Sequence, residues 1–150
     1  MRIMIDLDVL HVEFSKKMDE RKPAVKEFLG NLNQFEIYTP HILIDTVEKW
    51  RDKELVSKIK NFYELNSKRI ISAKEVADKL EELGLDEEEL KKQLRKVGIK
   101  DEDILLIVIS SIFKLEIKTF NKKHLLNNRG RINEILRRFG LNEITIEEPR

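Results

Sequence analysis

Apolar residues along the chain fall into short segments of strand length and longer segments with helical spacing. Short segments rich in apolar residues at residues 2–5, 35–38, 69–71 and 115–119 are candidate strands, and an edge strand is expected at 144–146. Apolar residues recur at helical spacing in the intervening segments, at residues 25–32, 40–62, 72–83, 86–97, 101–113 and 122–139. This alternation predicts an α/β fold with a central, mostly parallel sheet of four or five strands flanked by helices.

Polar residues and prolines mark where several of these helices begin. Thr39 precedes Pro40 and is expected to cap the helix that starts there. Ser72 is followed three residues later by Glu75, which is the spacing of a capping box. The helix at 101–113 is apolar nearly all round, so it should be the most deeply buried helix of the molecule.

Length and composition indicate one domain. The chain has 150 residues and no linker-like stretch, so a single domain is expected to cover residues 1–150. It has no cysteine, which excludes disulfides, cysteine nucleophiles and thiolate metal sites. The longest uncharged apolar run, residues 104–113, is about half the length needed to span a bilayer. Asp6 interrupts the apolar start and argues against a secretory signal, so we expect a cytoplasmic protein with no membrane partner.

The overall charge is balanced, at 29 Lys and Arg against 28 Asp and Glu, so no global positive field favours nucleic acid. One segment departs from this balance. Residues 121–138 hold a single acid, Glu134, and six basic residues: Lys122, Lys123, Arg129, Arg131, Arg137 and Arg138. This segment is either a local nucleic-acid contact or a solvated helix face.

Acidic and amide side chains stand at the ends of several predicted elements. Asp6 ends the first strand, Asp45 and Glu48 share a face of the second helix, Asp103 lies at the start of the most apolar helix, and Asn121 follows the fourth strand. Taken singly, they could be helix caps, a solvated face and a turn residue. Ligands of open parallel sheets bind beyond the carboxyl ends of the strands, so together these residues suggest a site. Oxygen ligands of this kind suit Mg²⁺ or Mn²⁺.

Histidines do not form a zinc site in this sequence. His11, His41 and His124 have no metal-ligand spacing between them. His11 and His41 are better explained as packing or surface residues. His124 follows the turn at Asn121, where it could either contact a phosphate or act as a cap.

Three segments in order resemble the motifs of the PIN-domain family, and within it the VapC-type toxin ribonucleases of prokaryotes. Residues 4–10, Met-Ile-Asp-Leu-Asp-Val-Leu, resemble the opening strand with its Asp-Thr-Asn/Ser-Val-Leu motif. Residues 38–45 resemble the Ser-Pro-x-x-x-x-Glu start of a helix. Asp103 and the apolar helix after it, followed sixteen residues on by Thr119-Phe120-Asn121, resemble the Asp-Ala-x-Ile-Ala-Ala helix and the Thr-x-Asp/Asn motif. The resemblance covers residues 1 to about 125.

The resemblance implies a three-layer PIN-like fold and a Mg²⁺- or Mn²⁺-dependent endoribonuclease, in which the metal activates water and neutralises charge on the phosphate. Asp6 and Asp103 would be direct metal ligands, and Asp45 or Glu48 would complete the cluster. Asn121 would bind a metal-bound water, supported by Thr119. The residues expected to approach the RNA backbone are Lys122, Lys123 and His124.

The chain also departs from the family pattern. Asp8 replaces the usual Asn or Ser, Asp45 stands where Glu is usual, and Asn121 stands where many members have Asp. The ligand from the second helix could therefore be Glu48, one turn after Asp45. These departures also leave a catalytically weakened module that binds RNA or protein as the alternative function.

The resemblance further implies a homodimer and an antitoxin partner. Trp50, Phe62 and Tyr63 are candidates for an interface, and core packing explains them equally well. A haloacid-dehalogenase-type phosphatase, with Asp6 as nucleophile and Asp8 as acid–base, is a less favoured alternative. That family needs a later acidic motif after a sheet strand, whereas Asp103 precedes a predicted helix.

Overall fold

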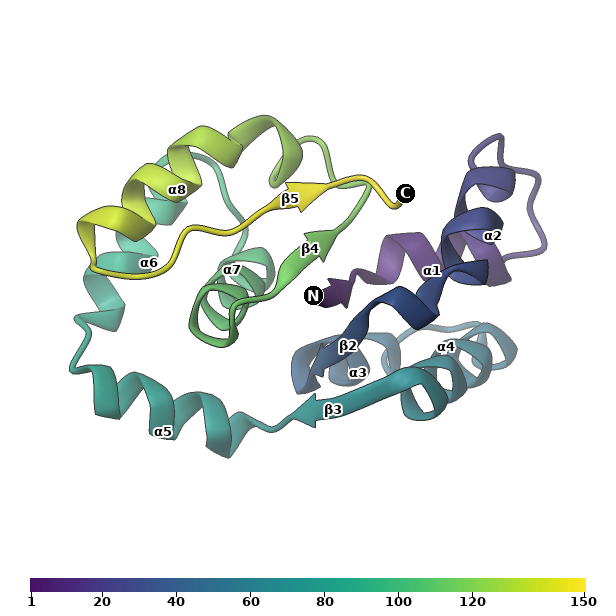
Figure 1. The fold of residues 1–150 in the computed structure, drawn as a ribbon, viewed down its shortest axis with the longest axis horizontal. Helices are drawn as coiled ribbons and strands as arrows, with labels where there is room; N and C mark the ends of the chain where they lie inside the picture. The colour runs from purple at the N-terminus through teal and green to yellow at the C-terminus, as the bar shows by residue number, and fades with distance from the viewer.

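A computed structural model describes residues 1–150 as a five-stranded parallel sheet flanked by eight α-helices (Figure 1). The strands are β1 (Arg2–Ile5), β2 (Glu36–Pro40), β3 (Ser67–Ile71), β4 (Glu116–Lys118) and β5 (Ile146–Glu147). The helices are α1 (Leu7–Phe14), α2 (Lys22–Gly30), α3 (His41–Val47), α4 (Lys53–Asn66), α5 (Ala73–Leu83), α6 (Glu87–Lys96), α7 (Asp101–Phe113) and α8 (Arg129–Arg138). Short 3₁₀ turns lie at Leu32–Gln34 and Leu126–Asn128.

The order of the strands, β3-β2-β1-β4-β5, places β1 in the middle. The chain builds outward from β1 through β2 to β3, and then returns to the other side of β1 with β4 and β5. The order therefore reverses between β1 and β4, where Ile5 pairs with Lys118. In open parallel sheets, ligands bind beyond the carboxyl ends of the strands at such a reversal.

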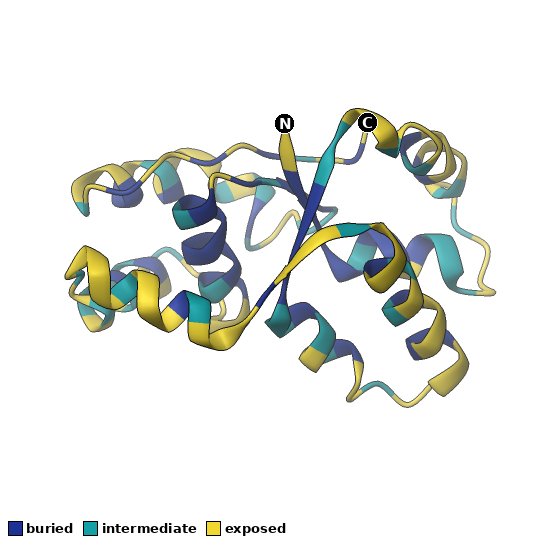
Figure 2. Ribbon diagram, turned by 60° about the horizontal axis from the view of Figure 1, so that its bottom comes forward, coloured by how far each residue is buried: buried dark blue, intermediate teal, exposed yellow.

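Helices cover the sheet on both sides. In Figure 1, α1, α2 and α4 lie on one side of the strands, and α6, α7 and α8 lie on the other. Buried residues run along the central strands, and exposed residues lie on the outer helices (Figure 2). Helix α7 is buried over nearly its whole surface, as its apolar pattern predicted. The expected α/β fold with a five-stranded parallel sheet is therefore confirmed.

Several helices differ from the prediction, and α8, for example, starts at Arg129 rather than near residue 122. Helix α1 was not predicted, because its apolar residues follow those of β1 without a clear change of period. The predicted helix at 40–62 is two helices, because Asp52 starts a new one by accepting a hydrogen bond from the backbone N–H of Leu55 at 3.1 Å. Both helices still present their apolar residues to the core.

Thr39 does not cap α3 as expected. Its side chain is fully buried in β2, and its hydroxyl oxygen lies 2.6 Å from that of Ser67 in β3. Pro40 itself is the residue that precedes the helix, in an extended conformation. The Thr-Pro pair therefore ends a strand, and its hydroxyl links two strands.

Tyr63 is a core residue and is not available for an interface. Its side chain is fully buried, and its hydroxyl donates a hydrogen bond to the carbonyl of Ile5 at 2.7 Å. This bond ties α4 to the last residue of β1, directly before Asp6. Phe62 is only partly buried against the core, as is Trp50. None of the helices combines the length and apolar character needed to cross a membrane.

Candidate metal centre

Asp6 lies directly after β1, at the point where the strand order reverses. Its backbone N–H extends the pairing with β4 by donating to the carbonyl of Lys118 at 3.0 Å. One carboxylate oxygen, Oδ1, accepts from the N–H of Leu7 at 2.8 Å and so caps α1. The other, Oδ2, accepts from the Thr119 hydroxyl at 2.8 Å. Asp6 is therefore both a helix cap and a side chain held towards the neighbouring strand.

Asp8, in the first turn of α1, also faces the segment at Thr119 that follows β4. Its Oδ2 accepts from the backbone N–H of Phe120 at 3.1 Å and lies 3.3 Å from the Thr119 hydroxyl. Its Oδ1 is buried and has no hydrogen-bond partner. Buried carboxylate oxygens are normally paired, so this oxygen is free to bind a ligand.

Asp103 approaches this pair from α7. It lies in the first turn of that helix, and its Oδ2 accepts from the side-chain amide of Asn121 at 3.2 Å. The backbone N–H of Asn121 donates to the Thr119 hydroxyl at 3.0 Å. A chain of hydrogen bonds thus links Asp103 through Asn121 and Thr119 to Asp6.

These side chains open into one cavity of about 470 Å³. Three of its polar residues, Asp6, Asp103 and Asn121, were predicted for the metal site from the sequence. The cavity is also lined by Leu7, Asp8, His11, Arg21, Thr46, Trp50, Lys100 and Glu102. We call this cavity the acidic cavity.

Residues that the sequence analysis did not place in the site include His11 and Trp50. Their rings meet edge to face, with centroids 5.8 Å apart. His11 lies three residues after Asp8 on α1, so prediction of that helix would have placed both side chains on one face. Trp50 follows α3 in a turn, and no local sequence signal directs it to the cavity.

Burial raises the pKa values of all three aspartates, and for Asp6 repulsion by the other two adds to this rise. The pKa of Asp6 rises to about 7, because burial disfavours its charged form and because Asp8 and Asp103 repel it. Burial also raises the pKa of Asp8. Burial raises the pKa of Asp103, and the nearby His124 partly offsets this rise. A divalent cation would relieve this repulsion.

Helix α3 does not bring its acidic residues into the acidic cavity. Asp45 is exposed, and the Glu48 carboxylate lies 3.1 Å from the ammonium of Lys60. The buried residues Leu43 and Val47 fix the rotation of the helix. Thr46, three residues after Leu43, therefore lines the cavity, and Asp45 points elsewhere. The expectation that Asp45 or Glu48 converges with Asp6 and Asp103 is not met in this structure.

The basic residues after β4 have different surroundings. Lys122 and Lys123 are exposed. His124 is half-buried, with Nδ1 lying 2.8 Å from the carbonyl oxygen of Gly98 and its backbone N–H donating to Asn121 at 3.1 Å. In the later part of the basic segment, Arg129 donates to the Ile146 carbonyl and Arg137 pairs with Glu143.

The donor chemistry of the acidic cavity suits a hard divalent cation. Asp6, Asp8 and Asp103 offer carboxylate oxygens, one of them buried and unpaired, whereas the amide oxygen of Asn121 accepts from the backbone N–H of His124. Carboxylate and amide oxygens are the ligands that Mg²⁺ and Mn²⁺ prefer. No three His, Asp or Glu side chains already stand in a metal-binding arrangement. Ion binding would therefore need these carboxylates to move closer together than they stand in this structure.

Comparison with known proteins identifies the fold. No protein-family model matches the chain, and no curated protein matches it in sequence. The structure is similar to a chain in the crystal structure of VapBC2 from Rickettsia felis bound to a DNA fragment from their promoter. The similarity has a TM-score of 0.61 at 20% identity and covers 99% of this chain and 98% of that chain. The chain therefore has the PIN-like fold that its sequence motifs predicted.

Proposed function

We propose that this protein is a Mg²⁺- or Mn²⁺-dependent endoribonuclease, and the toxin of a toxin–antitoxin pair. The observation that carries the proposal is the convergence of Asp6, Asp8 and Asp103 in one cavity at the strand-order reversal. These aspartates come from two distant segments and are joined through Thr119 and Asn121. A purely structural cap would not need such a network.

Each residue of the network has a distinct task in this proposal. A bound divalent ion would supply an activated water and neutralise charge on the phosphodiester. Asp6 and Asp103 would hold the ion, and Asp8 would contribute its unpaired Oδ1. Thr119 fixes the direction of the Asp6 carboxylate, and Asn121 fixes that of Asp103. Such supporting contacts typically change metal affinity or activity about 10–100-fold.

Cations around the acidic cavity support RNA as the substrate. Lys100 and Arg21 line it, and the exposed Lys122 follows Asn121. Positive side chains at the rim suit the phosphates of a nucleic-acid strand. Lys123 lies next in the chain and would extend this contact. The His124 contact with Gly98 assigns that side chain to holding the loop after β4.

The proposed partners are RNA, a cognate antitoxin and a second copy of the chain. The similar Rickettsia felis structure is of VapBC2, which supports an antitoxin partner for this protein as well. Phe62 and Trp50 are the remaining interface candidates from the sequence, since Tyr63 is buried. Trp50 also lines the acidic cavity, so an interface through it would close over the site.

The alternative is a PIN-like binding module with a weakened site. It is favoured by the absence of an acidic side chain from α3 in the cavity and of a ready three-residue metal arrangement. The phosphatase alternative loses support, because Asp103 lies in the first turn of α7 and follows no sheet strand.

Cleavage of single-stranded RNA with Mn²⁺, Mg²⁺ or EDTA tests the proposal. We expect cleavage that requires a divalent ion and falls at least about 10–100-fold in Asp103→Asn, which keeps the shape and removes the charge. Asp101→Asn is the matched control, because Asp101 lies in the same helical turn but pairs with Arg95 at the surface.

Three results would decide between the functions. Metal-dependent cleavage lost only in Asp103→Asn supports the ribonuclease. RNA binding without cleavage by the parent supports the binding module. Full activity of a folded Asp103→Asn protein would remove this residue from the site and contradict the proposed mechanism.

A further inference from the structure

A second hollow of about 630 Å³ adjoins the acidic cavity. Its lining includes Met18, Arg21, Phe120, Lys122 and Glu148. Arg21 also lines the acidic cavity, so the two hollows share one wall. Phe120 and Lys122 are the chain neighbours of Asn121, which holds Asp103. A strand with its phosphate at the aspartates would therefore have its next nucleotide at this hollow, which we call the side cavity.

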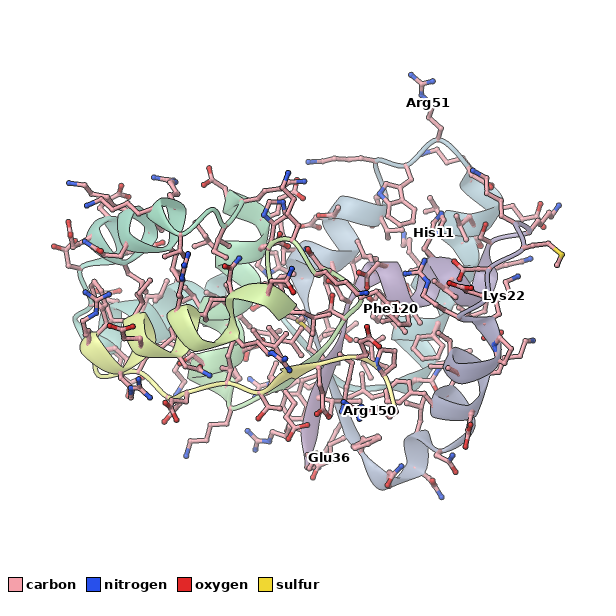
Figure 3. The ribbon with its side chains drawn as sticks, turned by 90° about the horizontal axis from the view of Figure 1, so that it is seen from above. His11, Lys22, Glu36, Arg51, Phe120 and Arg150 are labelled. Atoms are coloured by element: carbon pink, nitrogen blue, oxygen red, sulfur yellow. The ribbon has the colours of Figure 1, made fainter.

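Arg21 is held in one orientation at this shared wall. Its Nε and one terminal nitrogen donate to the two carboxylate oxygens of Asp19, at 3.0 and 2.8 Å. Its guanidinium carbon lies 4.6 Å from the centroid of the Phe120 ring. Figure 3 shows Phe120 on the side of the molecule that also carries His11. The guanidinium thus lies over the ring next to the acidic cavity.

The composition of the side cavity suits a planar polar ring. Aromatic side chains and Arg planes are the surfaces on which unstacked bases of single strands lie. Met18, which is fully exposed, adds an apolar surface. Glu148 and Glu20 supply carboxylates that accept hydrogen bonds, and Lys122 supplies a cation for a phosphate. The volume lies in the range of roughly 300–1,000 Å³ that is usual for small-ligand sites.

We propose that the side cavity is a base-recognition subsite for the nucleotide next to the phosphodiester that is cut, and that it prefers guanine. This inference rests on the proposed ribonuclease function and extends it to substrate choice. Guanine carries two adjacent N–H donors on its pairing edge, which match one carboxylate. Adenine, cytosine and uracil carry a single donor group there, so they would leave one oxygen of the Glu148 carboxylate without a partner.

Rates of cleavage of four short single-stranded RNAs test the subsite. The RNAs are identical except for the base beside the cut, and the reaction contains Mn²⁺. We expect the parent to cut the guanine RNA about tenfold faster than the other three, as a bidentate base contact allows. Glu148→Gln should lose most of this preference by slowing cleavage of the guanine RNA alone. Glu134→Gln on α8 is the matched control and should keep it.

A second variant tests the stacking surface. Phe120→Leu keeps an apolar side chain and removes the ring, so we expect cleavage of all four RNAs to fall by a similar factor of about ten. The preference for guanine should survive in this variant. Circular dichroism and thermal melting would confirm that both variants fold.

The outcomes separate the subsite from the ribonuclease function. Equal cleavage of the four RNAs by the parent, or an unchanged preference in Glu148→Gln, would overturn the subsite while leaving the ribonuclease intact. If no RNA is cut, the ribonuclease proposal fails. The binding of the same four RNAs, measured by fluorescence anisotropy, then tests the subsite by itself. Tighter binding of the guanine RNA that Glu148→Gln abolishes would support the subsite, and equal binding would overturn it.

Discussion

Asp6 shows how one side chain can meet two demands that the sequence presented as alternatives. Its position after a strand predicted either a helix cap or a metal ligand. In the structure one oxygen caps α1 through Leu7, and the other faces Thr119 beside the acidic cavity. Burial of this carboxyl beside Asp8 and Asp103 raises its pKa to about 7. The same residue therefore caps a helix and carries a charge that Asp8 and Asp103 repel, and a cation would relieve this repulsion.

The raised pKa of Asp6 predicts a pH dependence of the metal-free fold. The folded protein holds the proton of the Asp6 carboxyl more tightly than the unfolded chain does. The stability that this proton gives the fold is therefore complete below about pH 4 and is lost as the pH rises to about 7. Asp8 and Asp103 shift in the same direction. We expect Asp6→Asn to remove much of this loss and to melt at a higher temperature than the parent at about pH 8.

Melting temperatures in EDTA between about pH 4 and 9 measure this effect. Asp45→Asn is the control, because Asp45 is exposed and lies outside the cavity. Its curve should follow that of the parent. Parallel curves for the parent and Asp6→Asn across the whole range would show that folding does not raise the pKa of Asp6.

At the scale of elements, the rotation of α3 decides which residue faces the site. Leu43 and Val47 are one turn apart and both buried, so they direct one side of the helix to the core. Thr46 lies beside them and lines the acidic cavity, whereas Asp45 lies two residues from each and is exposed. A sequence motif gives the spacing of residues but not this rotation, which is why the predicted ligand from this helix was misplaced.

The break between α3 and α4 predicts a stability difference between two aspartates. Asp52 caps α4 by accepting from Leu55, so Asp52→Ala should lower the free energy of unfolding by roughly 0.5–2 kcal/mol. Asp45→Ala, at an exposed site, should change it by less than about 0.5 kcal/mol. Urea denaturation measures both values.

The same pair of variants also reports on the site. Asp45→Ala should retain RNA cleavage, since Asp45 does not line the cavity. A large loss of cleavage in a stable Asp45→Ala protein would show that α3 turns its acid into the site when RNA or metal binds. An equal loss of stability in the two variants would contradict the cap assigned to Asp52.

At the scale of the whole molecule, a nearly neutral chain concentrates negative charge at one place. The net charge is +1, yet Asp6, Asp8, Glu102 and Asp103 all line the acidic cavity. The order of the strands causes this, because the ends of β1 and β4 meet at the reversal and α7 starts beside them. Charge balance over the sequence therefore says little about the local field.

This concentration of charge predicts that divalent ions stabilise the fold by mass action. At an Mn²⁺ concentration about 100 times the dissociation constant, the gain is roughly 2.7 kcal/mol. For a domain of this size that corresponds to a melting temperature higher by roughly 5–10 °C. The shift should be larger at about pH 8 than at about pH 6, because binding must displace the proton that Asp6 holds.

Differential scanning fluorimetry with and without Mn²⁺ measures this shift. Asp103→Asn should reduce it, and the surface variant Asp101→Asn should not. A melting temperature that millimolar Mn²⁺ and Mg²⁺ leave unchanged would favour the binding module over the ribonuclease.

Local patterns in the sequence were sufficient to predict the class of fold and the main members of the candidate site. Strand and helix periods gave the α/β order, and the buried α7 followed from its continuous apolar pattern. Asp6, Asp103, Thr119 and Asn121 were found because each stands at the end of an element. Local patterns report such positions well, since burial period and capping chemistry depend on near neighbours in the chain.

Which of those ends meet depends on the packing of the whole chain. The pairing of Ile5 with Lys118 places Asp6 beside Thr119, although more than a hundred residues separate them in the chain. The same packing turned Asp45 outward, buried Tyr63, and joined Arg21 to Phe120 beside the acidic cavity. Helix rotation and the order of strands in a sheet result from the packing of the whole core, so short-range patterns in the sequence do not specify them.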